Sequence, residues 1–216
     1  MDNYNKYIEY KTKYIQLKML YNAEQRGGRM NIIIHISGVS GAGKTTLGNK
    51  LKDKLGSKIV VKDLDDLRDE FVKNTYNVNK SWTLEENKYQ QYINDFIKSQ
   101  NKPIIFVGLN DNPLGQKKIY YNLHSNHKYF IDIDDMIVVK QKCLRLLNDI
   151  QNDDGAMNDL INNNKRFVER FQKAIKIECG EKETKKMNSK WKKDYKKQGY
   201  KFMSGEDIYK TIVDIL

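Results

Sequence analysis

The chain has 216 residues, of which 39% are hydrophobic and 31% are charged, and its formal net charge is +11. These values fit one α/β domain with or without an appendage, and no apolar stretch approaches the roughly 18 residues of a membrane-spanning helix. The two cysteines form no CxxC motif and no disulfide framework, so we expect them to form neither a metal site nor a disulfide, and we expect a cytoplasmic protein. The basic excess either attracts polyanions such as nucleic acid, nucleotides or an anionic membrane surface, or serves only to keep a Lys- and Asn-rich protein in solution.

Residues 1–29 predict an amphipathic helix that ends in a Gly-Gly hinge. Tyrosine and leucine recur every three or four residues, which places them on one helix face. The residues in this stripe are Tyr7, Tyr10, Tyr14, Leu17 and Tyr21. The helix either packs on its own domain or docks a protein partner. The segment resembles the Tyr- and Lys-rich N-terminal segments of giant DNA virus proteins, which implies host cytoplasm or virion as its location.

After residue 30, short β-branched runs alternate with helical patterns up to the end of the chain. Strands are expected at 31–37, 58–63, 103–108, 129–133 and 200–203. Helices are expected at 44–55, 65–73, 84–100 (capped near Thr83), 115–125, 135–150 and 155–197, and after a cap at Ser204. This alternation predicts an α/β fold with a five-stranded parallel sheet that carries helices on both faces, in one domain spanning 30–216.

The segment Gly38–Thr45, GVSGAGKT, matches the phosphate-binding P-loop (Walker A) pattern and stands between an expected strand and an expected helix. Glycines let the backbone approach a phosphate, and the successive N–H groups and the positive end of the helix bind it. We expect Lys44 to reach the β- and γ-phosphates of ATP and the Thr45 hydroxyl to bind Mg²⁺. The expected nucleotide-binding residues are Gly38, Val39, Ser40, Gly41, Ala42, Gly43, Lys44, Thr45 and Thr46.

The three-glycine loop resembles that of the nucleoside, nucleotide and small-metabolite kinases, over about residues 31–216. The resemblance implies a P-loop NTPase sheet in the order 2-3-1-4-5 with a helical lid at about 155–197. It also implies transfer of the γ-phosphoryl group of ATP to a small acceptor, a nucleoside or nucleotide. One alternative is a polynucleotide 5′-hydroxyl kinase. Another, of a different class, is an ATP-binding assembly or virion protein with little turnover.

The second expected strand ends in the acidic sequence KDLDDLR, at residues 62–68. Ligands of parallel sheets bind beyond the carboxyl ends of the strands. Asp63-x-Asp65 resembles the paired acids of shikimate kinases, which implies Asp63 at magnesium and Asp65 at the acceptor hydroxyl. Asp66-Leu-Arg68 resembles the acceptor segment of adenylate kinases, which implies that Arg68 holds an acceptor phosphate. Alternatively, one of the three aspartates simply caps the next helix.

The predicted lid is strongly basic. The resemblance implies that lid arginines close on the transferring phosphates, and Arg166 and Arg170 are the candidates because they share one helix face. A solvated charged face is the alternative.

A second basic cluster follows from Lys182 to Lys197, where Trp191 and Tyr195 stand among eight lysines. Cations interleaved with aromatic rings suit a nucleic-acid strand, by charge and by stacking. Trp191 in the core is the alternative.

Overall fold

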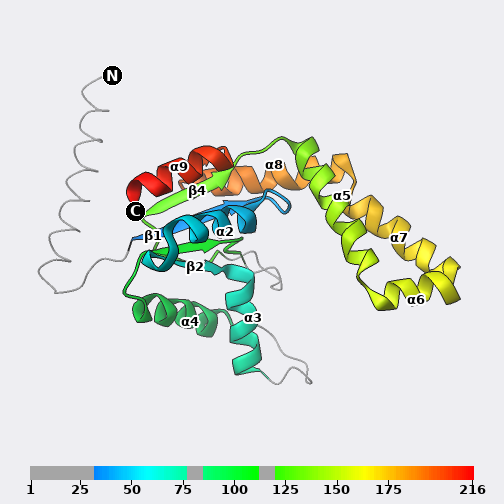
Figure 1. Ribbon diagram of the computed structural model, residues 1–216, viewed down its shortest axis with the longest axis horizontal. Helices are drawn as coiled ribbons and strands as arrows, with labels where there is room; N and C mark the ends of the chain where they lie inside the picture. Colours follow the sequence, from blue (N-terminus) through cyan, green and yellow to red (C-terminus); the bar gives the residue numbers. More distant parts are fainter. Residues whose placement is uncertain (1–31, 77–84, 112–119) are drawn as a thin grey trace, which may run out of the picture.

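The computed structural model describes residues 32–76, 85–111 and 120–216 (Figure 1). Its first half contains β1 (Ile33–Gly38), α2 (Lys44–Leu55), the 3₁₀ turn η1 (Gly56–Lys58), β2 (Val60–Asp63), α3 (Leu64–Thr75), α4 (Glu86–Ser99) and β3 (Ile104–Val107). Its second half contains β4 (His127–Ile131), α5 (Asp135–Gln151), α6 (Asp154–Asn162), α7 (Asn164–Glu178), α8 (Glu181–Lys197), β5 (Lys201–Met203) and α9 (Gly205–Ile215). The predicted N-terminal helix and the Thr83 cap lie outside the described residues.

The five strands form one parallel sheet in the order β2-β3-β1-β4-β5, which confirms the expected sheet and strand order. The register aligns the carboxyl ends of three neighbouring strands. Val107 of β3 pairs with Ile36 of β1 on one side and with Asp63 of β2 on the other. The loop that follows β1 and the carboxylates that follow β2 therefore open onto the same edge of the sheet, where parallel sheets hold their ligands.

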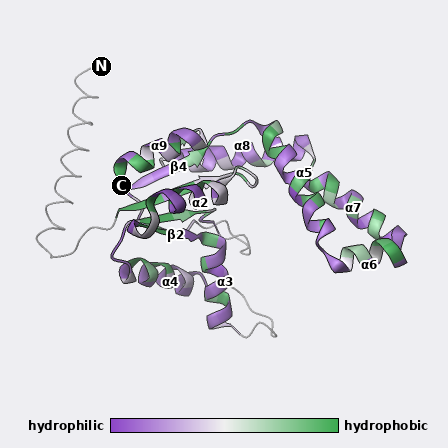
Figure 2. Cartoon of the chain, viewed as in Figure 1, coloured by the Kyte–Doolittle hydropathy of each residue, from purple (hydrophilic) through white to green (hydrophobic). Residues whose placement is uncertain are grey.

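Helices cover both faces of the sheet, and for this reason all six residues of β1 are buried. Ile34 and Ile36 belong to one core cluster with Leu47 and Leu51 of α2. This cluster also includes residues of α9. A second cluster joins the sheet to α3 and α4, and its members include Ile33, Phe106, Leu67, Phe71, Tyr89 and Ile93. Figure 2 shows the strands near the β2 label mostly in the hydrophobic colour, whereas much of β4 has the hydrophilic colour.

His35 is a buried structural residue in the middle of β1. Its Nε2 donates to the carbonyl oxygen of Gly108 at 3.1 Å, and its Nδ1 accepts from the Tyr200 hydroxyl. Burial lowers the pKa of the imidazole to about 3, so the ring is neutral. The residue therefore links β1 to the end of β3 and to the residue that precedes β5.

The helix expected at 115–125 is wrong in its described part, since residues 120–125 contain no helix. The Tyr121 amide donates to the carbonyl oxygen of Asn110 at 2.7 Å, and the Asn122 amide donates to Oε1 of Gln90 at 2.8 Å. Tyr121 and Leu123 are buried in the cluster below α3 and α4. An irregular segment that places two side chains in the core cannot be recognised from local propensity.

Residues 135–178 form a helical arm of α5, α6 and α7 that extends away from the sheet, and α8 then returns to it (Figure 1). The expected lid segment is thus helical, and it is divided among α6, α7 and α8. None of the described helices is long and apolar enough to cross a membrane. At the N-terminus of α9, the Ser204 hydroxyl accepts a hydrogen bond from the Asp207 backbone amide at 3.1 Å, which confirms the predicted cap.

The expectation that the two cysteines stay unpaired is wrong. Cys143 of α5 and Cys179 after α7 are joined by a disulfide, with their Cα atoms 5.2 Å apart. The reversal of the chain in the arm brings them together from positions 36 residues apart. The neighbouring ion pair between Lys142 Nζ and Glu178 Oε2, at 3.3 Å, fixes the same junction.

Candidate functional site

The loop between β1 and α2 has the backbone of an anion-binding turn. Gly41 and Gly43 have φ angles of 83° and 82°, which side chains other than glycine rarely adopt. Gly43 is the N-cap of α2 and provides no side-chain hydrogen bond, so the first amide groups of the helix lack a capping side chain. The first turn contains no acid and begins with Lys44. A cation at the positive end of a helix is unfavourable, and a bound anion would offset it.

Lys44 folds back over this loop. Its Nζ donates to the carbonyl oxygens of Gly38 at 2.9 Å and Val39 at 3.0 Å. Burial lowers the pKa of the Lys44 ammonium to about 8, the carboxylates of Asp65 and Asp63 act in the opposite direction, and Arg145 lowers it further. A phosphate beside the ammonium would favour its charged form.

Asp63 connects the loop to the start of α3. Its Oδ1 accepts from the Asp65 amide at 2.9 Å and so caps α3, and its Oδ2 accepts from the Thr45 hydroxyl at 3.2 Å. Asp63 is thus the aspartate that caps the helix, and it also contacts Thr45, which is expected to bind magnesium. Burial raises the pKa of the Asp63 carboxyl, and the nearby Asp65 and Asp66 raise it as well. A cation between the carboxyl and the Thr45 hydroxyl would relieve this repulsion.

A magnesium ion at this position would need oxygens from a ligand. Among the described residues, no group of three or more His, Cys, Asp and Glu side chains could hold a metal ion. Mg²⁺ is commonly bound by one or two carboxylates, substrate phosphates and waters. The pair of Thr45 and Asp63 fits this pattern.

Asp65 and Arg68 form an ion pair at the start of α3, with Arg68 Nη2 2.9 Å from Asp65 Oδ1. The Asp65 carboxylate is mostly exposed and lines the same cleft as Lys44, whereas the Arg68 side chain is only 18% exposed. Asp66 lies on the exposed surface of the same helical turn. Of the three aspartates, Asp63 and Asp65 are the two that the structure brings to the loop.

These groups surround one cleft of about 400 Å³ at the carboxyl edge of the sheet. The residues that line it are Ser40, Gly41, Gly43, Lys44, Thr45, Thr46, Asp63, Asp65, Gly108, Leu109, Gln141 and Arg145. Residues from four sequence regions therefore meet here, namely the loop, the end of β2, the residues after β3 and the middle of α5. Six of the nine expected loop residues and both expected catalytic aspartates are among them, whereas Gly38, Val39 and Ala42 are not.

The contribution of α5 is one that the sequence did not reveal. Arg145 Nη2 donates to the Ser40 hydroxyl at 3.2 Å, and Gln141 lies one helical turn before it. Because β4 neighbours β1 in the sheet, the helix after β4 passes beside the loop that follows β1. Gln141 and Arg145 are four residues apart and so share one helix face. With the strand order known, this spacing would have identified them as residues that face the loop.

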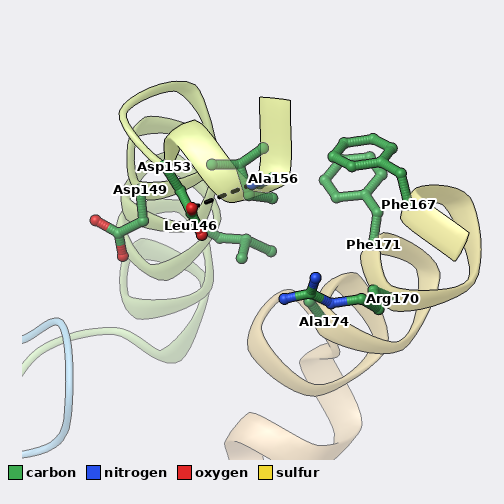
Figure 3. Close-up of a pocket in the computed structure, with 9 residues that line it drawn as sticks. Leu146, Asp149, Asp153, Ala156, Phe167, Arg170, Phe171 and Ala174 are labelled. Atoms are coloured by element: carbon green, nitrogen blue, oxygen red, sulfur yellow. Dashed lines mark hydrogen bonds between the residues drawn. The ribbon is translucent and has the colours of Figure 1, made fainter. Parts of the chain in front are cut away.

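The two arginines proposed for the lid are not among the residues lining this cleft. Arg170 points instead into a second, mostly apolar cavity of about 270 Å³ inside the arm (Figure 3). Phe167 and Phe171 stack beside it with their ring centres 5.6 Å apart. Arg166 lies in the first turn of α7, where its amide donates to the side chain of Asn163. The direction of the arm separates both residues from the loop, and Arg145 occupies the place expected for them.

No protein-family model matches the chain, and no curated protein matches its sequence. The interpretation of the cleft therefore depends on the residues that form it.

Proposed function

We propose that this protein is an ATP-dependent P-loop phosphotransferase that acts with Mg²⁺ on a small acceptor. The single observation behind the proposal is the convergence of Lys44, Thr45, Asp63 and Asp65 on a glycine loop whose helix start lacks a side-chain cap. Phosphoryl transfer needs little covalent participation from the protein, and positioning and charge neutralisation do most of the work. A cleft with these residues supplies both.

Each residue has a role in this proposal. The ammonium of Lys44 leaves the carbonyl oxygens of the loop and binds the β- and γ-phosphates, beside the amides at the start of α2. Thr45 and Asp63 hold Mg²⁺, which neutralises phosphate charge when it is bound. Arg145 lies above the loop at Ser40 and adds a second positive charge on the side of α5. The nucleotide would thus be bound between α2 and α5.

The acceptor would lie on the side of Asp65 and Arg68. The Asp65 carboxylate is exposed in the cleft and can accept the proton of a hydroxyl group. Arg68 pairs with Asp65 and can exchange that partner for a phosphate or carboxylate on the acceptor. This side of the cleft suits a nucleoside or nucleotide, the acceptor class that we propose.

The function is tested by ligand-induced stabilisation and by direct transfer. A non-hydrolysable ATP analogue with Mg²⁺, at about 100 times its Kd, should raise the melting temperature by on the order of 5–10 °C. Labelled γ-phosphate should then be transferred to one member of a panel of nucleosides, nucleotides and hydroxy acids. The absence of any stabilisation by MgATP would reject the proposal. Stabilisation without transfer to any acceptor would favour an ATP-binding protein with little turnover.

Arg145→Ala should weaken MgATP binding by about 10- to 100-fold, because it removes a charge-assisted contact at the loop. The matched control is Arg170→Ala, which removes the same side chain from the same arm but lies in the other cavity. We expect the control to bind MgATP like the wild type in isothermal titration calorimetry. Equal losses in both variants would mean that the arm closes on the nucleotide through Arg170 and would contradict the role given to Arg145.

A further inference from the structure

Helix α8 has an unusual distribution of charge. Its 17 residues contain eight lysines and three acids, so it carries a formal charge of +5 out of the +11 of the whole chain. The acids are Glu181, Glu183 and Asp194. Figure 2 shows α8 as hydrophilic along most of its length. A large part of the basic excess is therefore concentrated on one helix.

The side of α8 that faces the protein is closed. Thr184, Asn188 and Tyr195 are buried, and Trp191, which follows the same three- or four-residue spacing, packs on the core. The side-chain amide of Asn188 donates to Oδ1 of Asp135 in α5 at 2.6 Å, and the Tyr195 hydroxyl donates to Oδ1 of Asn110 at 2.9 Å. These contacts fix the rotation of α8 about its axis. They also place Tyr195 in the core and Trp191 partly buried against it, in line with the alternative that Trp191 packs in the core.

Five lysines occupy the opposite side of the helix. This lysine stripe consists of Lys182, Lys186, Lys190, Lys193 and Lys197, all of which are exposed. At 100° per residue, the five positions fall within an arc of about 80° that is centred opposite the buried side, and all three acids fall outside it. From Lys182 to Lys197 the stripe covers 16 residues and rises by about 22 Å, with a lysine at about every 6 Å.

The ion pairs of α8 lie beside the stripe and not on it. Lys192 pairs with Asp132 at 2.9 Å, and Lys185 pairs with Glu181. No ion pair joins a stripe lysine to any other residue in the described part of the chain. The helix therefore pairs two of its three flanking lysines, Lys185 and Lys192, and leaves one row of positive charge facing solvent.

We infer that the lysine stripe of α8 is a binding surface for the phosphate backbone of a nucleic-acid duplex. A duplex carries one negative charge per about 1.7 Å of its axis, and a rigid row of cations gains affinity by releasing its condensed counterions. Proteins that bind single strands add aromatic stacking, whereas in α8 Tyr195 is buried and Trp191 is partly buried against the core. Helices that lie on membranes insert an apolar face into the lipid, and here that face is occupied by the core. Recognition through lysine and phosphate alone is independent of sequence.

The inference predicts a steep dependence of duplex binding on salt. Five contacts at about 0.9 counterions each give a slope of log K against log salt of about −4 to −4.5, or a loss of at least about 250-fold between 50 and 200 mM salt. Fluorescence anisotropy with a labelled 20-base-pair DNA duplex measures this slope. Binding of the single strand should be weaker and its slope shallower.

Two variants with the same change in charge separate a local surface from a general attraction. In the first, the five stripe lysines are changed to Gln, which preserves helix propensity. In the control, five exposed lysines on or next to α2 and α4 are changed to Gln, namely Lys52, Lys54, Lys58, Lys98 and Lys102. We expect the first variant to lose about 100-fold or more in duplex affinity at 50 mM salt, with most of the slope, and the control to lose less than about 5-fold. Circular dichroism checks that both remain folded.

Three results would overturn the inference. These are equal losses in the two variants, tighter binding of the single strand than of the duplex, and displacement of the duplex by phosphatidylserine vesicles as efficiently as by unlabelled duplex. The surface is also independent of the proposed nucleotide site, since none of the stripe lysines lines the cleft. Lys44→Ala should therefore bind the duplex like the wild type, and a failure of either proposal leaves the other standing.

Discussion

Lys44→Ala is expected to lower phosphoryl transfer by on the order of 1000-fold, because it removes the positive charge nearest to the transferring group. The fold should remain intact. The ammonium contacts only carbonyl oxygens of its own loop, and its pKa of about 8 shows that burial disfavours its charged form. Single-turnover transfer from labelled ATP measures the loss, and thermal unfolding measures the stability. A variant that keeps near-wild-type transfer would exclude the P-loop assignment.

The lowered pKa of Lys44 adds a pH dependence to the same prediction. The pKa of Lys44 in the folded protein, about 8, lies below the ordinary value of 10.5. Between these two pH values the unfolded chain binds more protons than the folded protein does. Lys44 therefore increases the free energy of unfolding of the nucleotide-free protein as the pH rises. Nucleotide binding has the opposite dependence, because phosphates prefer the charged form. The affinity for MgATP should fall above pH 8 by up to about tenfold per pH unit. Lys44→Arg, whose charge is retained throughout, should show no such decline.

The parts of the fold that could be predicted are those in which local sequence and long-range packing agree. The β-branched run from Asn31 to Ser37 predicts a buried strand, and the structure buries all six residues of β1 between two layers of helices. Glycines with positive φ angles occur within the motif at Gly41 and Gly43, where the pattern places them. The agreement of a motif with its structural context was sufficient to locate the cleft.

The parts that could not be predicted depend on where distant segments meet. Arg145 reaches Ser40 because two strands are neighbours in the sheet, and nothing near position 145 carries that information. Cys143 and Cys179 meet because the arm reverses direction. Trp191 and Tyr195 share a helix with eight lysines, and only the packing of α8 shows that both rings face the core. In each case the residue type was visible and its orientation was not.

The two cleft aspartates should respond differently to substitution by asparagine. Asp63→Asn keeps a side chain that caps α3, so we expect the stability to change little. Its carboxylate charge is lost beside Thr45, and the Mg²⁺ concentration for half-maximal activity should therefore rise by at least about tenfold. Asp65→Asn should instead lower kcat by on the order of 100- to 10,000-fold while MgATP affinity stays the same, because it removes the proposed proton acceptor.

Asp66→Asn is the matched control for both substitutions. It makes the same change of charge in the same first turn of α3, but its side chain is exposed and does not line the cleft. We expect its kinetics to equal those of the wild type. Initial rates over a series of Mg²⁺ concentrations at saturating ATP separate the three variants, and thermal unfolding reports the loss of a cap. If Asp63→Asn and Asp65→Asn only lowered the melting temperature and left the magnesium dependence and kcat unchanged, the carboxylates would serve the start of α3 alone.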